Sequence, residues 1–250
     1  MKKLITILFA LLCIQCFQFE EINDISAIIS ISSKDNILTM PADNKTTLKI
    51  TAFISIASDT DKRDIEFFTS SGVFTENAKQ SFVKNAKDTI EVNGTKFLSS
   101  TVTLKSNNII SDNVKVTAKI LQVPASINII FTESQPKKLK LSSNVFGIDN
   151  TFTSEAIFTA NVTSDTGYPS SGHEVEFLVF NASNDSQFKE ARFREENLKL
   201  NGTGQASTKF TAGNLNLGGN KFEGDLKIVA RLKNNPEITD TIIFNVFKIN

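Results

Sequence analysis

The sequence contains no tryptophan, one tyrosine, Tyr168, and one histidine, His173. The lack of tryptophan and near lack of tyrosine argue against a sugar-binding platform of stacked aromatic rings. A Ser-His-Asp triad needs a histidine held between a nucleophile and a carboxylate, and no nucleophile motif accompanies His173, which we interpret as a surface residue in a turn. Structural zinc needs several Cys or His ligands. We therefore predict no enzyme, no catalytic residues, no metal site and no cofactor.

Cysteine is also scarce, because the only two, Cys13 and Cys16, lie near the N-terminus. The body of the chain therefore has no internal disulfide and must rely on apolar burial. Phenylalanine supplies that apolar surface: there are 21 Phe residues, and they pack interiors without needing a polar partner. The net charge is zero, so no basic field attracts nucleic acid, and we expect no nucleic-acid partner.

The N-terminus has the pattern of an export signal. A short basic segment, residues 1–3, is followed by an apolar run over residues 4–14, too short to remain as a membrane-spanning helix. Cys16 follows this run, as in bacterial lipoprotein leaders, where the cysteine becomes the lipidated first residue. We predict a lipoprotein-type signal peptide over residues 1–16, lipidation at Cys16 and a tether over residues 17–25. Gln15 departs from the usual small residues, so lipidation at Cys13 and cleavage without a lipid stay open.

The rest of the chain aligns with itself, which indicates an internal repeat. The offset drifts from 108 to 113 along four matched segments, as expected if loops vary and strands do not. The matches are 50–52 with 158–160, 65–68 with 175–178, 116–120 with 228–232, and 129–131 with 242–244. We predict a first domain over residues 26–131, a linker over 132–138 and a second domain over 139–250.

Each matched segment alternates apolar and polar residues, which is typical of a half-buried strand. In residues 48–54 the apolar side chains would face a core, while Lys49 and Thr51 would face solvent. A one-residue slip would bury the lysines, so the register is well specified. We predict an all-β fold with two tandem immunoglobulin-like β-sandwiches. Residues 186–200 fit either a helix or a strand over 188–193 followed by a turn.

Turn residues carry a resemblance to a known family. Asp165, Gly167, Pro169 and Gly172 precede the apolar segment 175–177, and a second glycine turn occupies 202–206. Both are similar to turns in the repeat of bacterial immunoglobulin-like domains of the invasin/intimin type (Big-1-like). The expected reason is that Gly supplies positive φ and Pro sets the bend. In the first domain, residues 41–46 resemble the family's opening turn, with Asn44 in place of glycine.

The resemblance implies extracellular sandwiches that act as spacers and adhesion modules. It leads us to expect an exported, surface-exposed protein held by a lipid anchor at the outer membrane or cell surface, or otherwise periplasmic or secreted. Its ligand would be a protein or a glycan. The alternative is a carbohydrate-binding accessory lipoprotein of the cell surface.

The first place to look for a ligand surface is the Gly-rich segment 211–225, about six residues longer than its counterpart in the first domain. The alternative is a mobile hairpin without a binding role. Asp59, Asp61 and Asp64 form the densest acidic cluster and would suit calcium, but Lys62 and Arg63 lie inside it and favour a solvated turn. Glu195 and Glu196 are interpreted as a solvated charged stretch.

Overall fold

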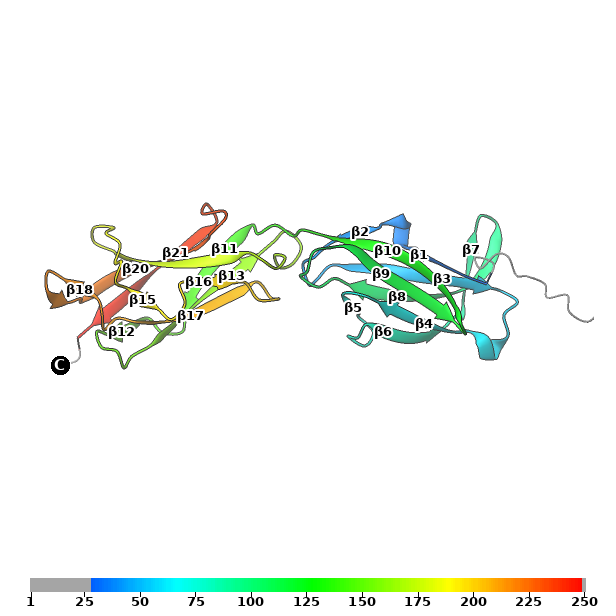
Figure 1. Ribbon diagram of the computed structural model, residues 1–250, viewed down its shortest axis with the longest axis horizontal. Coiled ribbons are helices and arrows are strands. Elements are labelled where there is room, and N and C mark those ends of the chain that lie inside the picture. Colours follow the sequence, from blue (N-terminus) through cyan, green and yellow to red (C-terminus); the bar gives the residue numbers. More distant parts are fainter. Residues whose placement is uncertain (1–27, 249–250) are drawn as a thin grey trace, which may run out of the picture.

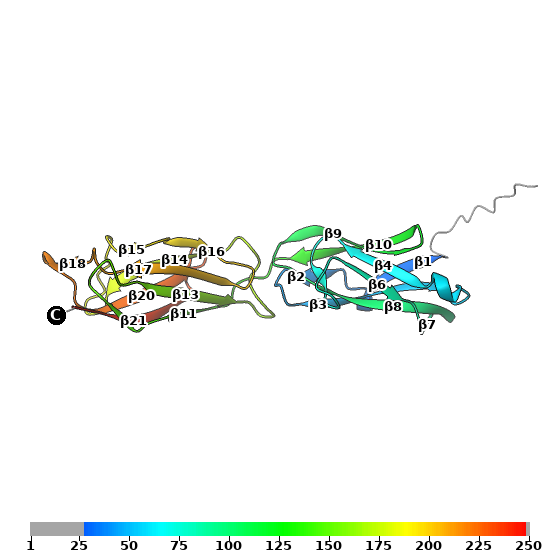
Figure 2. The same cartoon turned by 90° about the horizontal axis from the view of Figure 1, so that it is seen from below.

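The computed structural model describes residues 28–248, and in this range it contains β-strands and two short 3-10 helices, η2 (Lys34–Asn36) and η3 (Thr60–Lys62). The expected signal peptide and tether, with Cys13 and Cys16, lie outside the described residues. None of the helices in the described range is long and apolar enough to cross a membrane. The all-β fold class is confirmed: two tandem immunoglobulin-like sandwiches lie end to end (Figures 1 and 2).

The first sandwich consists of two facing five-stranded sheets. One runs in the order β1-β3-β8-β5, with β7 also paired to β8; its strands are β1 (Ile29–Ser33), β3 (Thr47–Ser55), β5 (Val73–Phe74), β7 (Asp88–Val92) and β8 (Thr95–Lys105). The other runs in the order β2-β10-β9-β4-β6; its strands are β2 (Thr39–Pro41), β4 (Asp64–Thr69), β6 (Ser81–Asn85), β9 (Ser111–Ile120) and β10 (Val123–Thr132).

The second sandwich repeats this plan with a four-stranded and a five-stranded sheet. The order β11-β13-β17-β15 joins β11 (Lys138–Ser143), β13 (Ala156–Thr163), β15 (Arg192–Phe193) and β17 (Gln205–Thr211). The order β12-β21-β20-β14-β16 joins β12 (Gly147–Asp149), β14 (Glu174–Asn181), β16 (Asn197–Lys199), β20 (Gly224–Leu232) and β21 (Thr239–Phe247). A separate hairpin pairs β18 (Asn216–Leu217) with β19 (Asn220–Lys221).

The register expected from apolar alternation is confirmed in both domains. In β3 the alternate residues Leu48, Ile50, Ala52 and Ile54 are buried, while Lys49 is exposed. The same alternation appears in β9, β13 and β20. Each domain therefore has its own apolar core between its two sheets, and the two cores form separate clusters.

Phenylalanine rings hold the second core together in place of a disulfide. Phe158 is fully buried, and its ring lies 5.0 Å from that of Phe244, 5.9 Å from that of Phe210 and 6.1 Å from that of Phe193, all in edge-on geometry. Edge-to-face pairs at these spacings are favourable because the positive ring edge meets the negative face. The two sheets are thus joined through one aromatic cluster.

One match of the internal repeat was wrong by two residues. Ile127 pairs with Val116 and Ile242 pairs with Ile228, so Ile127 rather than Ile129 is the counterpart of Ile242. The cause is the connection ahead of the last strand. Residues 121–122 link β9 to β10, whereas residues 233–238 link β20 to β21.

Residues 186–200 form no helix. They contain the short strands β15 and β16 and are otherwise irregular, so strand and turn were the better alternative, although the strand is shorter than 188–193. Phe188, Ala191 and Phe193 are all buried in the second core. Phe188 and Ala191 have helix-like spacing because the segment bends where it packs against the edge of the core.

The glycines and the Asn44 residue in these turns are required for two different structural reasons. Asn44 adopts φ 55° and Gly204 adopts φ 70°, so the left-handed positions expected in these turns are confirmed. Gly167 is not at positive φ, and that expectation was wrong. It is glycine because a Cβ there would lie 2.8 Å from the carbonyl oxygen of Asp43 and 2.8 Å from the Cβ of Lys45. The contact crosses between domains, which no local pattern reveals.

We expect Phe158→Ala to lower the free energy of unfolding of the second domain by about 3–5 kcal/mol, because it leaves a cavity among three other rings. Urea titration followed by circular dichroism measures this change. Phe146→Ala is the matched control: the Phe146 ring is 99% exposed, so its removal should change stability by no more than about 0.5 kcal/mol. Equal losses in the two variants would contradict the aromatic cluster as the source of stability.

Candidate functional site

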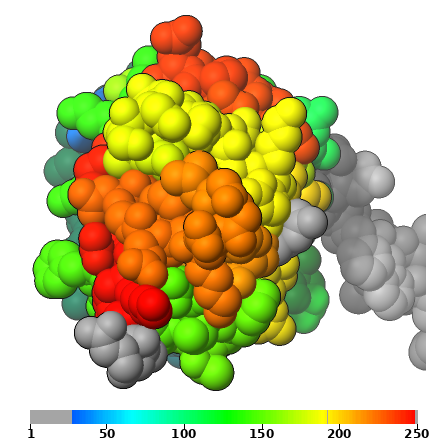
Figure 3. Space-filling view, turned by 90° about the vertical axis from the view of Figure 1, so that its left-hand side faces the viewer, coloured from blue at the N-terminus to red at the C-terminus, as the bar shows by residue number. Residues whose placement is uncertain are grey.

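The predicted ligand segment lies at the end of the second domain that is farthest from the first domain (Figures 1 and 3). Residues 212–223 link β17 to β20, whereas only residues 106–110 link the equivalent strands β8 and β9, so the extra length is confirmed. The segment forms the β18–β19 hairpin, and its turn, Gly218–Gly219, has φ 60° and 85°. Two central residues with positive φ are the geometry of a tight type I′ hairpin.

The base of this hairpin is fixed to the core. Leu215 and Phe222 are buried, the Phe222 N–H donates to the Leu215 carbonyl at 2.9 Å, and the Phe222 ring lies 5.0 Å from that of Phe188. Lys221 Nζ donates to the carbonyl of Asn150 at 3.2 Å. The hairpin therefore projects from an anchored base, as a rigid binding loop would.

A groove of about 330 Å³ runs beside the hairpin base. It is lined by Asn181, Ala182, Ser183, Leu217, Phe222, Glu223, Gly224 and Asp225. Large apolar side chains are exposed on the segments that meet at this end: Leu217 on β18, Phe247 on β21 and Phe152 in the loop after β12. In Figure 3 the orange hairpin occupies the centre of this end face, with the green residues near β12 and the red end of β21 below it.

The carboxylate of Asp149 organises the loop that carries Phe152. It accepts hydrogen bonds from the N–H of Thr151 at 2.9 Å and from the hydroxyls of Thr151 and Ser154. The hydrogen bond from Ser154, followed by those from Thr151 and the charge of Lys221, holds the pKa of Asp149 below its ordinary value. The ionised carboxylate is thus part of the folded loop at neutral pH.

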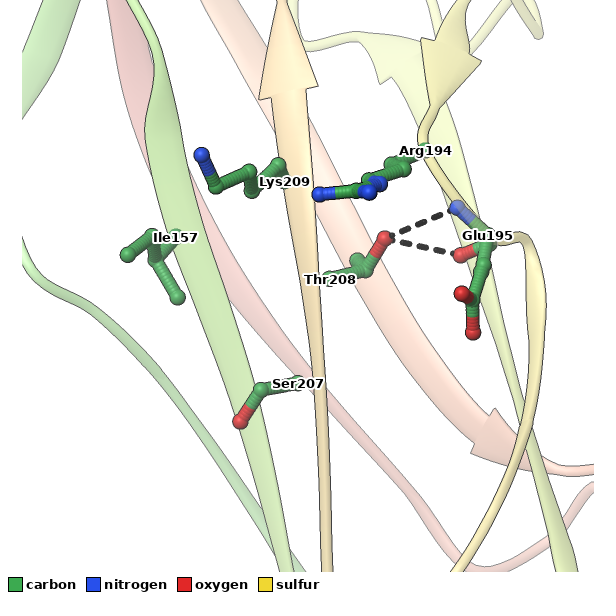
Figure 4. Close-up of a pocket in the computed structure, with 6 residues that line it drawn as sticks. All are labelled: Ile157, Arg194, Glu195, Ser207, Thr208 and Lys209. Carbon is green, nitrogen blue, oxygen red and sulfur yellow. Dashed lines mark hydrogen bonds between the residues drawn. The ribbon is translucent and has the colours of Figure 1, made fainter.

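A second open groove, of about 290 Å³, lies on the outer face of the β13–β17 sheet (Figure 4). Thr208 Oγ1 donates to the Glu195 carbonyl at 2.8 Å and accepts from the Glu195 N–H at 3.2 Å, which ties the segment after β15 onto β17. Arg194 and Lys209 lie above these bonds, and Lys209 Nζ is 2.7 Å from a carboxylate oxygen of Glu155. The groove therefore presents cationic and hydroxyl side chains on an open face of the sheet.

The other residues singled out from the sequence are distributed over both domains. His173 is half-buried rather than fully exposed: its side chain is 16% exposed, and its Nε2 lies 3.7 Å from a carboxylate oxygen of Glu133. Asp59 pairs with Lys62 at 2.9 Å, and hydrogen bonding to Lys62 holds the pKa of Asp59 below its ordinary value. Asp64 instead accepts from Asn85. Within residues 28–248, no three His, Cys, Asp or Glu side chains form a group that could hold a metal ion.

The sequence identified the long loop but missed its neighbours. Phe152, Asn181 and Phe247 lie far from this loop along the chain and meet its end of the domain only through the sheet topology. A local signal did exist for the Asp149 loop, since an Asp side chain often accepts from the backbone N–H two residues on, here that of Thr151. It could have been found.

Comparisons with known proteins support the fold. No protein-family model and no curated protein matches the chain. Among solved structures, invasin, a bacterial integrin-binding protein, is similar with a TM-score of 0.55 and 13% identity over 88% of this chain and 39% of invasin. The adhesin InvE of Yersinia pseudotuberculosis matches at a TM-score of 0.42 and 12% identity, over 90% of this chain and 60% of InvE.

A glycosyl hydrolase family 2 member from Bacteroides cellulosilyticus also matches, at a TM-score of 0.35 and 9% identity, over 85% of this chain and 24% of the enzyme. The chain thus spans less than two thirds of the length of these proteins. At these identities, the likeness to invasin shows the fold alone, which is that of tandem immunoglobulin-like sandwiches.

We expect Phe222→Ala to lower the stability of the second domain by about 3–5 kcal/mol and to speed amide exchange across residues 212–224, because it removes the ring that fixes the hairpin base. Hydrogen exchange with mass spectrometry localises the change. Leu217→Ala, at a side chain 52% exposed, is the control and should leave exchange at the base unchanged. If Phe222→Ala alters exchange no more than Leu217→Ala, the hairpin is not anchored in this way.

Proposed function

We propose that this chain is an exported, surface-exposed spacer and adhesion module with no catalytic activity. The observation that carries the proposal is the separation of its two ends. Ile29 of β1 pairs with Ile54, at the end of the first domain away from the second, and the β18–β19 hairpin lies at the opposite end of the molecule (Figure 1). A chain tethered through its N-terminus would therefore hold the hairpin away from the membrane.

The exposed chemistry at the far end suits recognition of another molecule. Leu217, Phe152 and Phe247 are apolar and exposed, and the groove at the hairpin base combines Leu217 and Phe222 with amide, hydroxyl and carboxylate side chains. Apolar anchors surrounded by polar groups are typical of binding surfaces. The proposed ligand is a protein or glycan that this end contacts.

The proposed anchor is a lipid on Cys16, which would hold the protein at the outer membrane or cell surface. More than one acyl chain anchors stably where one does not. Without the lipid, the exported protein would be periplasmic or secreted.

We expect the wild-type protein to incorporate a fatty-acid analogue during growth and to fractionate with membranes, and Cys16→Ser to lose both properties. In-gel detection of the labelled band measures this. Cys13→Ser is the matched control and should stay labelled. Loss of label in Cys13→Ser alone would show that the lipid is attached to Cys13. Unlabelled wild-type protein in the culture medium would contradict lipid anchoring.

We expect Leu217→Asp to weaken attachment about tenfold when cells displaying the chain bind wells coated with extracellular matrix proteins, because it places a charge in the apolar binding end. Arg194→Ala, on the flat face of the same domain, is the matched control and should bind like wild type. Attachment that is insensitive to Leu217→Asp would contradict a ligand site at the hairpin.

The groove of Figure 4 favours a second candidate, a carbohydrate-binding accessory protein of the cell surface. Arg194 and Lys209 suit acidic sugars, and Ser207 suits sugar hydroxyls. The same variants separate the candidates on a glycan array. Binding lost in Arg194→Ala and kept in Leu217→Asp favours the accessory role, and the reverse favours adhesion through the hairpin.

A further inference from the structure

The contact between the two domains is polar. The apolar cores do not merge across it. Domains joined by a short linker with a small interface are expected to move relative to one another. Here, however, hydrogen bonds cross from one domain to the other at several points, and two of them, from Thr166 and Tyr168, converge on the buried residue Asp43.

Asp43 lies in the turn between β2 and β3 and is fully buried. One carboxylate oxygen, Oδ1, accepts from the N–H of Lys45 at 2.9 Å, the N–H of Thr46 at 2.7 Å and the hydroxyl of Ser106 at 3.1 Å. The other, Oδ2, accepts from the hydroxyls of Thr46 and Thr166, each at 2.6 Å. No Lys, Arg or His among residues 28–248 forms an ion pair with it. A buried charge without a cation must be stabilised by donors, and all five are used.

One of these five donors belongs to the second domain. Thr166 reaches Oδ2 from the loop between β13 and β14, and two residues later the N–H of Tyr168 donates to the carbonyl of Asp43 at 2.9 Å. Gly167, between them, lies so close to Asp43 that a side chain would not fit. The loop therefore wraps around Asp43 on both its backbone and its carboxylate.

Three further contacts flank this centre. Ser171 N–H donates to the carbonyl of Asn108 at 2.6 Å, and Asn44 Nδ2 donates to the carbonyl of Gly202 at 3.0 Å. In the linker, Ser134 N–H donates to Ser170 Oγ at 2.7 Å. The contacts surround the same turn from different sides, which resists both bending and twisting.

We propose that the carboxylate of Asp43 is a clamp that locks the two domains in one orientation, so that they behave as a single stiff unit, and that loss of its negative charge loosens the joint. This deepens the spacer role proposed above, because a stiff unit holds its far end at a fixed distance. Its readout is the orientation of the domains, which requires no ligand and no lipid anchor.

Several charged and titratable groups surround the clamp, and Asp43 is the buried one among them. Lys45 is on the same turn and Lys105 ends β8; the facing loop carries Asp165 and Tyr168, with Lys137 of the linker paired to Asp165 at 3.8 Å. Glu133 and His173 pair at the other side of the linker. Burial tends to raise the pKa of Asp43, but the hydrogen bonds from Thr166, Thr46 and Lys45 outweigh it and lower the pKa below the ordinary value.

The direction of that shift fixes the pH dependence. A carboxyl whose pKa is lower in the folded joint stabilises it fully above the unfolded pKa, and the contribution is lost as pH falls through the folded pKa. The joint should therefore be locked at neutral pH and should loosen only in strong acid. Neutralising Asp43 by mutation reproduces that loss at neutral pH, without acid acting on other groups.

The test measures the distance distribution between two spin labels by electron–electron double resonance. Labels are placed at Gln122→Cys in the first domain and Asn234→Cys in the second, both exposed positions, in a full chain with Cys13→Ser and Cys16→Ser.

The decisive pair of variants is Thr166→Val and Thr46→Val. Both remove a hydroxyl that donates to Oδ2 at 2.6 Å, but only the first bond crosses between domains. Asp43→Asn and Asp149→Asn form a second pair, since both carboxylates order a turn and only Asp43 lies at the joint.

We expect a single narrow distribution in wild type, Thr46→Val and Asp149→Asn, and a distribution at least twice as wide in Thr166→Val and Asp43→Asn. Amide exchange at Tyr168 should be at least tenfold faster in Thr166→Val than in Thr46→Val. A broad wild-type distribution, an unchanged Thr166→Val, or equal broadening by Thr46→Val would overturn the clamp. If Asp43→Asn fails to fold, Thr166→Val still decides the question, because it leaves the local turn of Asp43 intact.

Discussion

The arrangement of the two domains depends on the requirement of one buried charge for hydrogen-bond donors. Within residues 28–248 Asp43 forms no ion pair, so its buried carboxylate is stable only where several N–H and O–H groups surround it. Those groups come from its own turn, from Ser106 after β8 and from Thr166 of the second domain. Because all of them must converge on one carboxylate, the turn, the end of a sheet and the neighbouring domain are placed relative to one another.

The division between apolar cores and a polar joint separates two tasks. Each sandwich is held together by its own buried aliphatic and phenylalanine side chains, without a disulfide in the described body of the chain. The joint fixes the orientation between the domains rather than adding apolar burial, because hydrogen bonds depend on angle and apolar contacts do not. Because each core lies within one domain, a change in the orientation between the domains leaves both cores intact.

The sequence was informative wherever the determining contacts are local. Alternation predicted the register of β3, β9, β13 and β20, and Asn44 was correctly expected to adopt the left-handed turn in place of glycine. It was uninformative where distant segments meet. Gly167 is glycine because of Asp43 in the other domain, and His173 is partly covered because Glu133 of the linker lies beside it. The long loop of the candidate site was visible as extra length, but Phe152 and Phe247 join it only in three dimensions.

The repeat also shows that copies of one domain do not present equivalent ends. In strand register Thr151 takes the place of Asp43, because Asn150 and Ala42 each donate to the last residue of the closing strand, Phe247 and Thr132. The second domain keeps a turn-ordering carboxylate, but at Asp149, where its oxygens are used by its own loop. At this end the Asp149 carboxylate is used within its own loop and the apolar side chains are exposed. The end therefore does not reproduce the surface around Asp43 that contacts the second domain. The same structural position thus serves as a joint in one copy and as an exposed, apolar end in the other, and this difference supports the proposal that the second copy's end contacts a ligand.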